Sequence, residues 1–274
     1  MKSTEPDDLS SLISRWPGEP SLAVATPDRL LGTAGDTSTP RHLASITKLF
    51  TCYATLVAIE EGTLALDQPA GPRGSTVRHL MAHASGLMFD THNLASGVGE
   101  RRVYSNTGIE VLADHLAFRS GIAFADYLHE GVLQPIGLGH LRLTGSPAHA
   151  LVASVDDLVV FGRELLSPTL VASATLAEAT SPVYPELRGV LPGFGLMAHN
   201  TWGLGFEIKG DKVPHWTAPA HPPTTFGHFG GAGSFLWIDP EAQMIGASAG
   251  TEPFGEWAVA AWPVANGELA RRYH

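Results

Sequence analysis

The sequence predicts an α+β fold in which both chain ends build one antiparallel sheet, flanked by helices, and the middle forms an inserted, mainly helical lobe. Two observations lead to this. Patterns typical of strands occupy residues 21–33 and 202–249, near the two ends of the chain. Between them, residues 66–199 are rich in helical patterns and loops. Segments arranged in this order are typical of a sheet that is completed by the end of the chain and packed by helices.

The division into lobes also predicts where a substrate binds. We expect residues 1–66 and 200–274 to form the sheet lobe and residues 67–199 to form the helical lobe. A groove between two such lobes is the usual place for a substrate site. The chain has 274 residues, of which 44% are hydrophobic, enough for a sizeable core.

The first elements are predicted as follows. Residues 8–16 resemble a short amphipathic helix, and residues 21–26 and 29–33 form two strands around a turn at Pro27 and Asp28. A long helix then covers the apolar run from Leu43 to Glu61 and ends at Gly62, a common C-terminal stop residue.

The remaining elements complete the two lobes. In the middle of the chain, Thr76 caps a short helix that ends near Gly86, and Asn106 caps a helix over 107–120. Further helices are expected over 124–134 and, after a capping box that starts at Ser154, up to Leu166. The last strands are expected over 202–209, 225–229, 233–238 and 244–249, followed by a helix over 255–272.

Composition excludes several classes of function. With 17 basic and 27 acidic residues the net charge is −10, and no cluster of Lys or Arg stands out, so we expect no nucleic acid as a partner. Cys52 is the only cysteine, which rules out an intrachain disulfide. The 13 His show no compact ligand spacing, so we predict no metal, and nothing indicates a cofactor.

The first residues are acidic and lack the basic and apolar regions of a signal peptide. The sequence contains no run of about 18 apolar residues, the length that a membrane-spanning helix requires. We therefore expect a cytoplasmic soluble protein without a membrane partner.

The candidate chemistry starts at Ser45 and Lys48. These residues are three positions apart at the head of the long helix, so both lie on one helical face, one turn apart. A serine hydroxyl needs a neighbouring base, and a lysine can serve when apolar surroundings lower its pKa. The positive end of the helix dipole favours a developing oxyanion. Because Ser-x-x-Lys also arises by chance, the motif alone does not establish catalysis.

Two further motifs can complete this site. Tyr104 and Asn106 stand in a loop before a helix, where they can relay a proton and orient a substrate, or where Asn106 simply caps the helix. The segment 227–234, Gly-His-Phe-Gly-Gly-Ala-Gly-Ser, can bring free backbone N–H groups to an oxyanion, or can be only a bulged hairpin turn.

Taken together, Ser45-x-x-Lys48, Tyr104-x-Asn106 and His228-x-Gly230 resemble the serine β-lactamase and penicillin-binding-protein superfamily. The pattern is most similar to class C β-lactamases and the β-lactamase-like carboxylesterases of the family VIII type. The resemblance covers about residues 20–250. Segments 79–87, 153–158 and 202–205 also resemble stretches that are common in this group.

The resemblance implies roles for the matching residues. Ser45 would be the nucleophile and Lys48 its proton acceptor, while Tyr104 would share the base role and protonate the leaving group. Asn106 would hold the acyl side of the substrate. The oxyanion would be bound by the backbone N–H groups of Ser45 and Gly231, next to Gly230. A covalent acyl-enzyme follows from these roles.

Two departures from the family pattern bear on the substrate. Phe229 stands where the family usually has Thr, which removes a hydroxyl that helps to bind a carboxylate and suggests apolar contact instead. His228 takes the place of a Lys and is mostly neutral at pH 7. We therefore expect small neutral esters or amides to be preferred to penicillins and peptides.

The leading hypothesis is thus a serine hydrolase, most simply a carboxylesterase, that forms an acyl-enzyme on Ser45. A β-lactamase or D,D-peptidase activity is the second hypothesis, and acyl transfer to an alcohol, with the same chemistry up to the acyl-enzyme, is the third. A non-catalytic binding module is also conceivable, although such a module would not need Ser45, Lys48 and Tyr104. The oligomeric state is left open.

Overall fold

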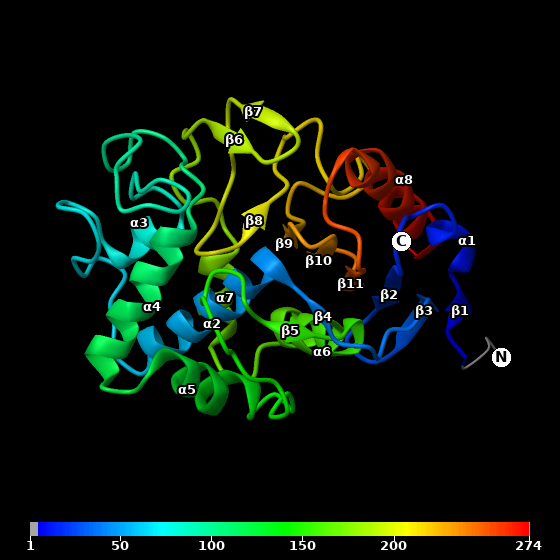
Figure 1. Ribbon diagram of the computed structural model, residues 1–274, viewed down its shortest axis with the longest axis horizontal. Coiled ribbons are helices and arrows are strands. Elements are labelled where there is room, and N and C mark those ends of the chain that lie inside the picture. The colour runs from blue at the N-terminus through cyan, green and yellow to red at the C-terminus, as the bar shows by residue number, and fades with distance from the viewer. Residues whose placement is uncertain (1–4, 274) are drawn as a thin grey trace.

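A computed structural model describes residues 5–273 and has a seven-stranded mixed sheet at its centre (Figure 1). The strand order across the sheet is β1-β3-β2-β11-β10-β9-β8. The strands are β1 Asp7–Asp8, β2 Ser21–Ala25, β3 Leu30–Ala34, β8 Glu207–Ile208, β9 Phe226–Gly230, β10 Ser234–Asp239 and β11 Met244–Ala249. The first and last parts of the chain meet where β2 pairs with β11 in antiparallel register. This confirms the predicted α+β class, in which both chain ends contribute to one sheet.

Helices cover both faces of the sheet, and each face has its own core. Helix α6 (Val155–Leu166) packs on β2, β10 and β11. It approaches closely, because a side chain at Gly162 would lie 2.6 Å from Cγ2 of Ile245. The other face is covered by α1 (Ser10–Ile13) and α8 (Glu256–Tyr273), whose side chains form the second core with Trp237 and Phe235. The central strands are therefore buried on both faces, which hides the alternation of a half-exposed strand.

Helix α2 (Thr47–Glu60) is the helix around which the remaining helices are arranged. Every residue from Thr47 to Ala58 is buried, a pattern typical of a helix enclosed by protein on all sides. It contacts α4 (Asn106–Ser120), α5 (Phe124–Leu128) and the π-helical turn η2 (His129–Leu133). The short helix α3 (Val77–Met81) packs on α4, as Figure 1 shows.

Several predicted boundaries were wrong. The helix predicted over 8–16 is shortened to α1, and Asp8 belongs to strand β1 instead. Because β1 pairs in parallel with β3, the sheet is mixed and not purely antiparallel. The cap of α4 is Ser105, whose Oγ accepts a hydrogen bond from Gly108 N, and Asn106 is the first helical residue. The strand expected over 202–209 is reduced to β8.

Other local predictions are confirmed. Ser154 and Asp157 form the capping box of α6, and the side chain of Thr76 caps α3. Six further elements were not predicted. They are the paired strands β4 (Arg41–His42) and β5 (Val152–Ala153), the hairpin strands β6 (Gly189–Leu191) and β7 (Gly195–Met197), helix α7 (Ser173–Ala179), and the 3-10 turn η1 (Ala44–Ile46) before α2.

The proposed division into two lobes stays a prediction. Helix α6 lies within the expected helical lobe, yet it packs on the sheet, and one apolar core runs from the sheet through α2 to α4 and α5. Among the described residues, no helix combines the length and the apolar character that a membrane span requires.

Candidate active site

A strained turn presents Ser45 at the start of α2. The residue before it, Ala44, has φ = +46°, a conformation that residues with a side chain rarely adopt. Strand β9 fixes this turn from the other side, since a side chain at Gly230 would lie 2.2 Å from the carbonyl oxygen of Leu43. The hydroxyl of Ser234 donates a hydrogen bond of 2.9 Å to the same oxygen. The end of β9 and the start of α2 are therefore held together at Ser45.

Lys48 is completely buried, and its amine lies 3.1 Å from Oγ of Ser45. The amine also donates to Oδ1 of Asn106 at 2.6 Å and to the carbonyl oxygen of Ala148 at 2.9 Å. A neutral amine has two hydrogens and one lone pair. Because both carbonyl oxygens can only accept, they take the two hydrogens and leave the lone pair for the hydroxyl of Ser45.

Lys48 can act as a base only when its amine is neutral. Burial lowers the pKa of Lys48 to about 7, although Cys52, Asp90 and Glu110 act in the opposite direction. A large fraction of the amine is therefore neutral at pH 7. The burial that the apolar sequence around Lys48 predicted is thus present in the structure.

Tyr104 comes from the segment before α4 and meets His228 of β9. The phenol oxygen lies 2.9 Å from Nε2 of His228, although the two residues are 124 positions apart. Nδ1 of His228 accepts a hydrogen bond of 2.8 Å from the backbone N–H of Phe229, so the proton of a neutral ring is on Nε2. Burial lowers the pKa of His228 to about 3, which keeps the ring neutral. His228 therefore donates to the oxygen of Tyr104.

Tyr104 is linked to Ser45 as well as to His228. Burial raises the pKa of Tyr104, and a hydrogen bond with Ser45 acts in the opposite direction. The phenol thus stays protonated at neutral pH. The amine of Lys48 lies 4.8 Å from the centre of the Tyr104 ring. Ser45, Lys48, Tyr104 and His228 form one continuous cluster.

Two aromatic side chains hold the Tyr104 ring in place. The rings of His83 and Trp202 lie 4.7 and 5.8 Å from it, measured between centroids. His83 has φ = +53°, and its Nδ1 accepts a hydrogen bond from the backbone N–H of Ser105. Both residues belong to segments noted in the sequence for their family resemblance. Their contacts indicate a positioning role.

Asn106 is fixed from two sides. Its Oδ1 accepts from Lys48, and its Nδ2 donates a hydrogen bond of 2.8 Å to Oδ1 of Asp90. The carbonyl oxygens of Met88 and Phe89 accept hydrogen bonds from Ser105 and from the first N–H groups of α4. The loop that contains Asp90 therefore orients the amide of Asn106. Sequence reasoning missed Asp90, since it belongs to no motif.

Replacing Asp90 by asparagine is expected to shift the pH dependence of activity toward lower pH. The substitution keeps an oxygen for Nδ2 of Asn106 but removes a negative charge that raises the pKa of Lys48. The pKa of Lys48 therefore falls, and the neutral amine persists at lower pH. The measurement is the pH at half-maximal kcat/KM. Asp114→Asn, an exposed change on α4, is the control, and an equal shift in both variants would contradict the role of Asp90.

The glycine segment forms the turn between β9 and β10. Gly231 is exposed, and a side chain built there would meet no atom within 4 Å, so its backbone borders open space. Gly230 lies against the turn before Ser45. The position of this turn is compatible with the expected oxyanion site, and the role of the Gly231 N–H group stays a prediction.

The expectation that the ring of Phe229 contacts a substrate was wrong. Neighbouring residues of a strand point to opposite faces, so His228 faces Tyr104 whereas Phe229 faces the second core. The ring is 4% exposed and packs on Phe254 at 4.8 Å and on Trp262 at 5.9 Å.

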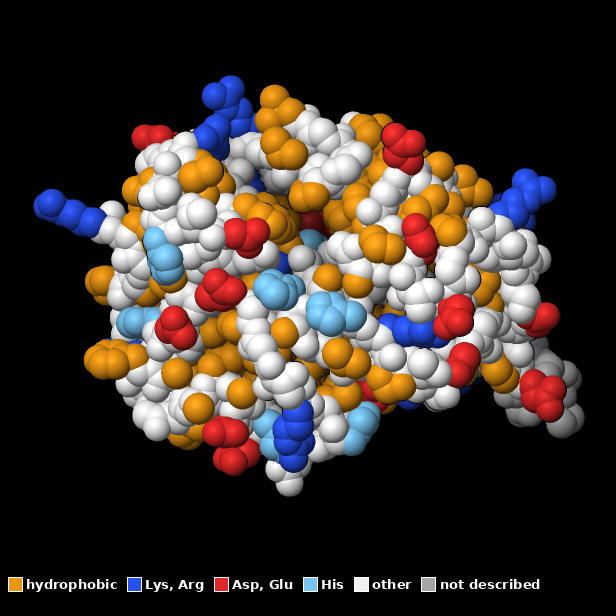
Figure 2. Space-filling view, viewed as in Figure 1, with side chains coloured by type: hydrophobic (Ala, Val, Ile, Leu, Met, Phe, Trp, Pro, Cys, Tyr) orange, Lys and Arg blue, Asp and Glu red, His pale blue; other side chains and the backbone are white. Residues whose placement is uncertain are grey.

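An apolar pocket of about 580 Å³ adjoins Tyr104. Its walls come from the loop around Met88 and Phe89, from residues 101–104, and from the β6–β7 hairpin. Figure 2 shows a hollow above the N-terminal end of α2 and β9, with hydrophobic side chains around its rim. No sequence pattern indicated this pocket, because the two strands of the β6–β7 hairpin have only three residues each.

Comparison with known proteins agrees with this fold. The model of the beta-lactamase family matches residues 22–265. A crystal structure of a beta-lactamase from Mycobacterium bovis is 43% identical, has a TM-score of 0.94, and is covered over 98% of its chain and 96% of this one. EstCE1, a hydrolase with promiscuous acyltransferase activity, has a TM-score of 0.73 over 93% of this chain and 95% of its own, but at 17% identity shows only the shared fold.

Curated relatives match over shorter segments. Penicillin-binding protein 4* of Bacillus subtilis is 30% identical over an alignment of 135 residues, and the match covers 37% of this chain and 30% of the relative. The D-alanyl-D-alanine-carboxypeptidase/endopeptidase AmpH of Escherichia coli is 23% identical over an alignment of 201 residues, and the match covers 53% of this chain and 52% of the relative. The matches thus span less than two thirds of either relative.

Proposed function

The chain belongs to the beta-lactamase family of hydrolases, and on this premise we propose that it forms an acyl-enzyme on Ser45 and acts as a carboxylesterase. Its substrates are small esters or amides that are neutral around the scissile bond. The observation that carries the proposal is the arrangement of Lys48, whose two carbonyl partners leave its lone pair facing Ser45.

The proposed reaction starts with proton transfer from Ser45 to neutral Lys48 as Oγ attacks the substrate carbonyl carbon. The carbonyl oxygen becomes an oxyanion, which the backbone N–H groups of Ser45 and Gly231 bind. The C–O or C–N bond then breaks, Tyr104 gives its proton to the leaving group, and the proton on Lys48 restores the phenol. Water attacks the acyl-enzyme by the reverse sequence of proton transfers and releases the acid.

The raised pKa of Tyr104 supports Lys48 as the base and Tyr104 as the acid. His228 donates to the phenol oxygen and stabilises negative charge that develops there during the transfer. Because His228 is neutral, it offers no charge to a carboxylate next to the scissile bond. This supports ester hydrolysis over β-lactam or D,D-peptide hydrolysis, which the names of the curated relatives suggest as the second candidate.

The experiment that tests the proposal has two parts. A fluorophosphonate should add one adduct to the purified protein, and peptide mass spectrometry should locate it on Ser45. Values of kcat/KM are then compared for p-nitrophenyl acetate, p-nitrophenyl butyrate and nitrocefin. The absence of any adduct would favour a non-catalytic binding module. A kcat/KM for nitrocefin above about 10⁶ M⁻¹s⁻¹, typical of efficient enzymes, would replace the esterase proposal by a β-lactamase.

Activity is expected to rise with pH through a limb near pH 7. Only neutral Lys48 can accept the proton of Ser45, and its pKa is about 7, so kcat/KM falls below this pH and reaches a plateau about one to two units above it. The measurement is kcat/KM for a p-nitrophenyl ester between pH 5 and 9. A flat profile, with chemistry shown to limit the rate, would remove Lys48 from the role of base.

A further inference from the structure

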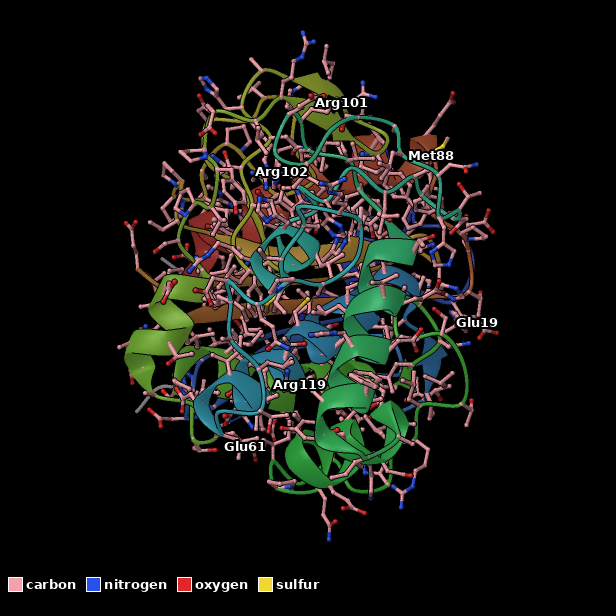
Figure 3. All side chains as sticks on the ribbon, turned by 90° about the vertical axis from the view of Figure 1, so that its left-hand side faces the viewer. Glu19, Glu61, Met88, Arg101, Arg102 and Arg119 are labelled. Atoms are coloured by element: carbon pink, nitrogen blue, oxygen red, sulfur yellow. The ribbon has the colours of Figure 1, made fainter. Side chains whose placement is uncertain are left out.

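Three arginines surround the apolar pocket beside Tyr104. Arg101 and Arg102 directly precede its wall at Val103 and Tyr104, and Arg188 precedes the β6–β7 hairpin on the other side. The two segments run side by side, because the N–H of Arg102 donates to the carbonyl oxygen of Arg188 at 2.9 Å. Figure 3 shows Arg101 next to this hairpin, with Arg102 below it and Met88 to one side.

None of these three arginines forms an ion pair with a carboxylate within residues 5–273. The guanidinium of Arg102 is buried and donates only to the backbone carbonyl oxygens of Ala82, Val183, Tyr184 and Asn200. Other arginines of the chain do have acidic partners: Arg41, Arg78, Arg271 and Arg272 each pair with a glutamate.

The neighbouring segments also contain the carboxylates of Asp90, Glu100 and Glu186, but none of them forms an ion pair with these arginines within the described residues, and Asp90 accepts from Asn106. Burial lowers the pKa of Arg102 to about 10, and Glu186 acts in the opposite direction through space without forming an ion pair with it. The carboxylate of Glu100 accepts from the backbone N–H of Gly97. In a chain with a net charge of −10, this apolar pocket thus has three arginines in its walls, and no ion pair within residues 5–273 neutralises them. Low-dielectric walls strengthen their field inside the pocket.

We propose that this pocket binds a leaving group that has an apolar body and an anionic end, and that Arg101 and Arg188 recognise the anion. The inference rests on the proposed function and refines it, because the substrate is neutral at the scissile bond but charged at its far end. Arg101 and Arg188 are exposed and can reach a ligand, although one amino group of Arg101 donates to the carbonyl oxygen of Ala95. The guanidinium of Arg102 is held by carbonyl groups and contributes its field.

The residues that line the pocket indicate that it binds the leaving group of the substrate and not the acyl group. Tyr104, which protonates the leaving group in the proposed reaction, forms part of the wall, and Asn106, expected on the acyl side, does not. The apolar body would rest on the rim, where Phe89 and Leu196 are 49% and 71% exposed. Such exposed apolar side chains around a pocket are typical of a ligand site.

The kinetic test compares two acetate esters of equal size. One is 3-(4-acetoxyphenyl)propionate and the other is its uncharged primary amide. We expect the anionic ester to have a kcat/KM about tenfold higher, mainly through KM, as one charge-assisted hydrogen bond would give. The double change Arg101→Gln and Arg188→Gln should bring this ratio close to one. Arg119→Gln, an exposed change on α4 far from the pocket in Figure 3, should leave it unaltered.

A binding test separates this inference from the proposed function. Calorimetry with the Ser45→Ala protein measures the affinities of 3-(4-hydroxyphenyl)propionate and its amide, without any catalysis. Tighter binding of the anion, lost in the double arginine variant and weakened in 1 M NaCl, supports the inference even if neither ester is hydrolysed. Equal affinities, or a preference that the arginine changes do not alter, overturn it. So does an ester-hydrolysing protein with no kinetic preference for the anionic ester.

Discussion

Replacing Ser45 by alanine is expected to lower kcat/KM for ester substrates by about 10⁴-fold or more, the scale on which loss of a catalytic nucleophile acts. Lys48 and Tyr104 remain in place, but no oxygen is left to form the acyl bond. The fold should persist, because Ser45 is partly exposed and its hydroxyl is not part of either core. The measurement is the rate of p-nitrophenyl butyrate hydrolysis, together with the loss of the fluorophosphonate adduct.

Ser173→Ala is the matched control for Ser45→Ala. Ser173 is an exposed serine at the start of α7, so its loss should change neither activity nor labelling. Unfolding curves of both variants should coincide with that of the unchanged protein. If Ser45→Ala kept more than about 1% of the activity, the nucleophile would have to be another group.

The sequence predicted those parts of the site that depend on local spacing. Ser45 and Lys48 meet because one helical turn separates them, a relation that any helix at this position would give. The contact of Tyr104 with His228 could be expected only from the family resemblance, since no local rule joins residues so far apart. The general layout of the sheet could also be predicted, because strand patterns occur near both ends of the chain.

The sequence could not predict features that depend on how loops fold over the site. Asp90 reaches Asn106 because the backbone carbonyl of Phe89 is bonded to the start of α4, and no residue pattern signals that path. The pocket beside Tyr104 likewise needs the β6–β7 hairpin, whose strands have only three residues each. Short strands of this kind carry too little periodicity to be recognised.

Phe229 shows why a buried strand gives no information about its faces. All five residues of β9 are buried, so polar and apolar residues do not alternate with exposure, and the motif His-Phe-Gly does not tell which side chain faces the groove. The family pattern suggested a ring beside the substrate. Packing places it with Phe194, Trp216, Phe254 and Trp262 in the second core.

Replacing Phe229 by threonine is therefore expected to destabilise the protein by about 3 kcal/mol or more, the usual cost of removing a buried aromatic ring. The change leaves a cavity between four aromatic side chains. It also places a hydroxyl among apolar groups, and an unsatisfied hydroxyl adds about 1 to 3 kcal/mol. Unfolding in urea, followed by tryptophan fluorescence, measures the loss as a lower midpoint.

Phe229→Leu is the control, because it keeps an apolar side chain and removes less volume, so its midpoint should lie between those of the unchanged protein and Phe229→Thr. The ratio of kcat/KM for nitrocefin to that for p-nitrophenyl acetate distinguishes the two possible orientations of the ring. Since the ring faces α8 and not the groove, this ratio should stay the same in any Phe229→Thr protein that remains folded. A Phe229→Thr protein with an unchanged unfolding midpoint and a raised nitrocefin ratio would place the side chain against the substrate and would contradict the orientation of β9 described above.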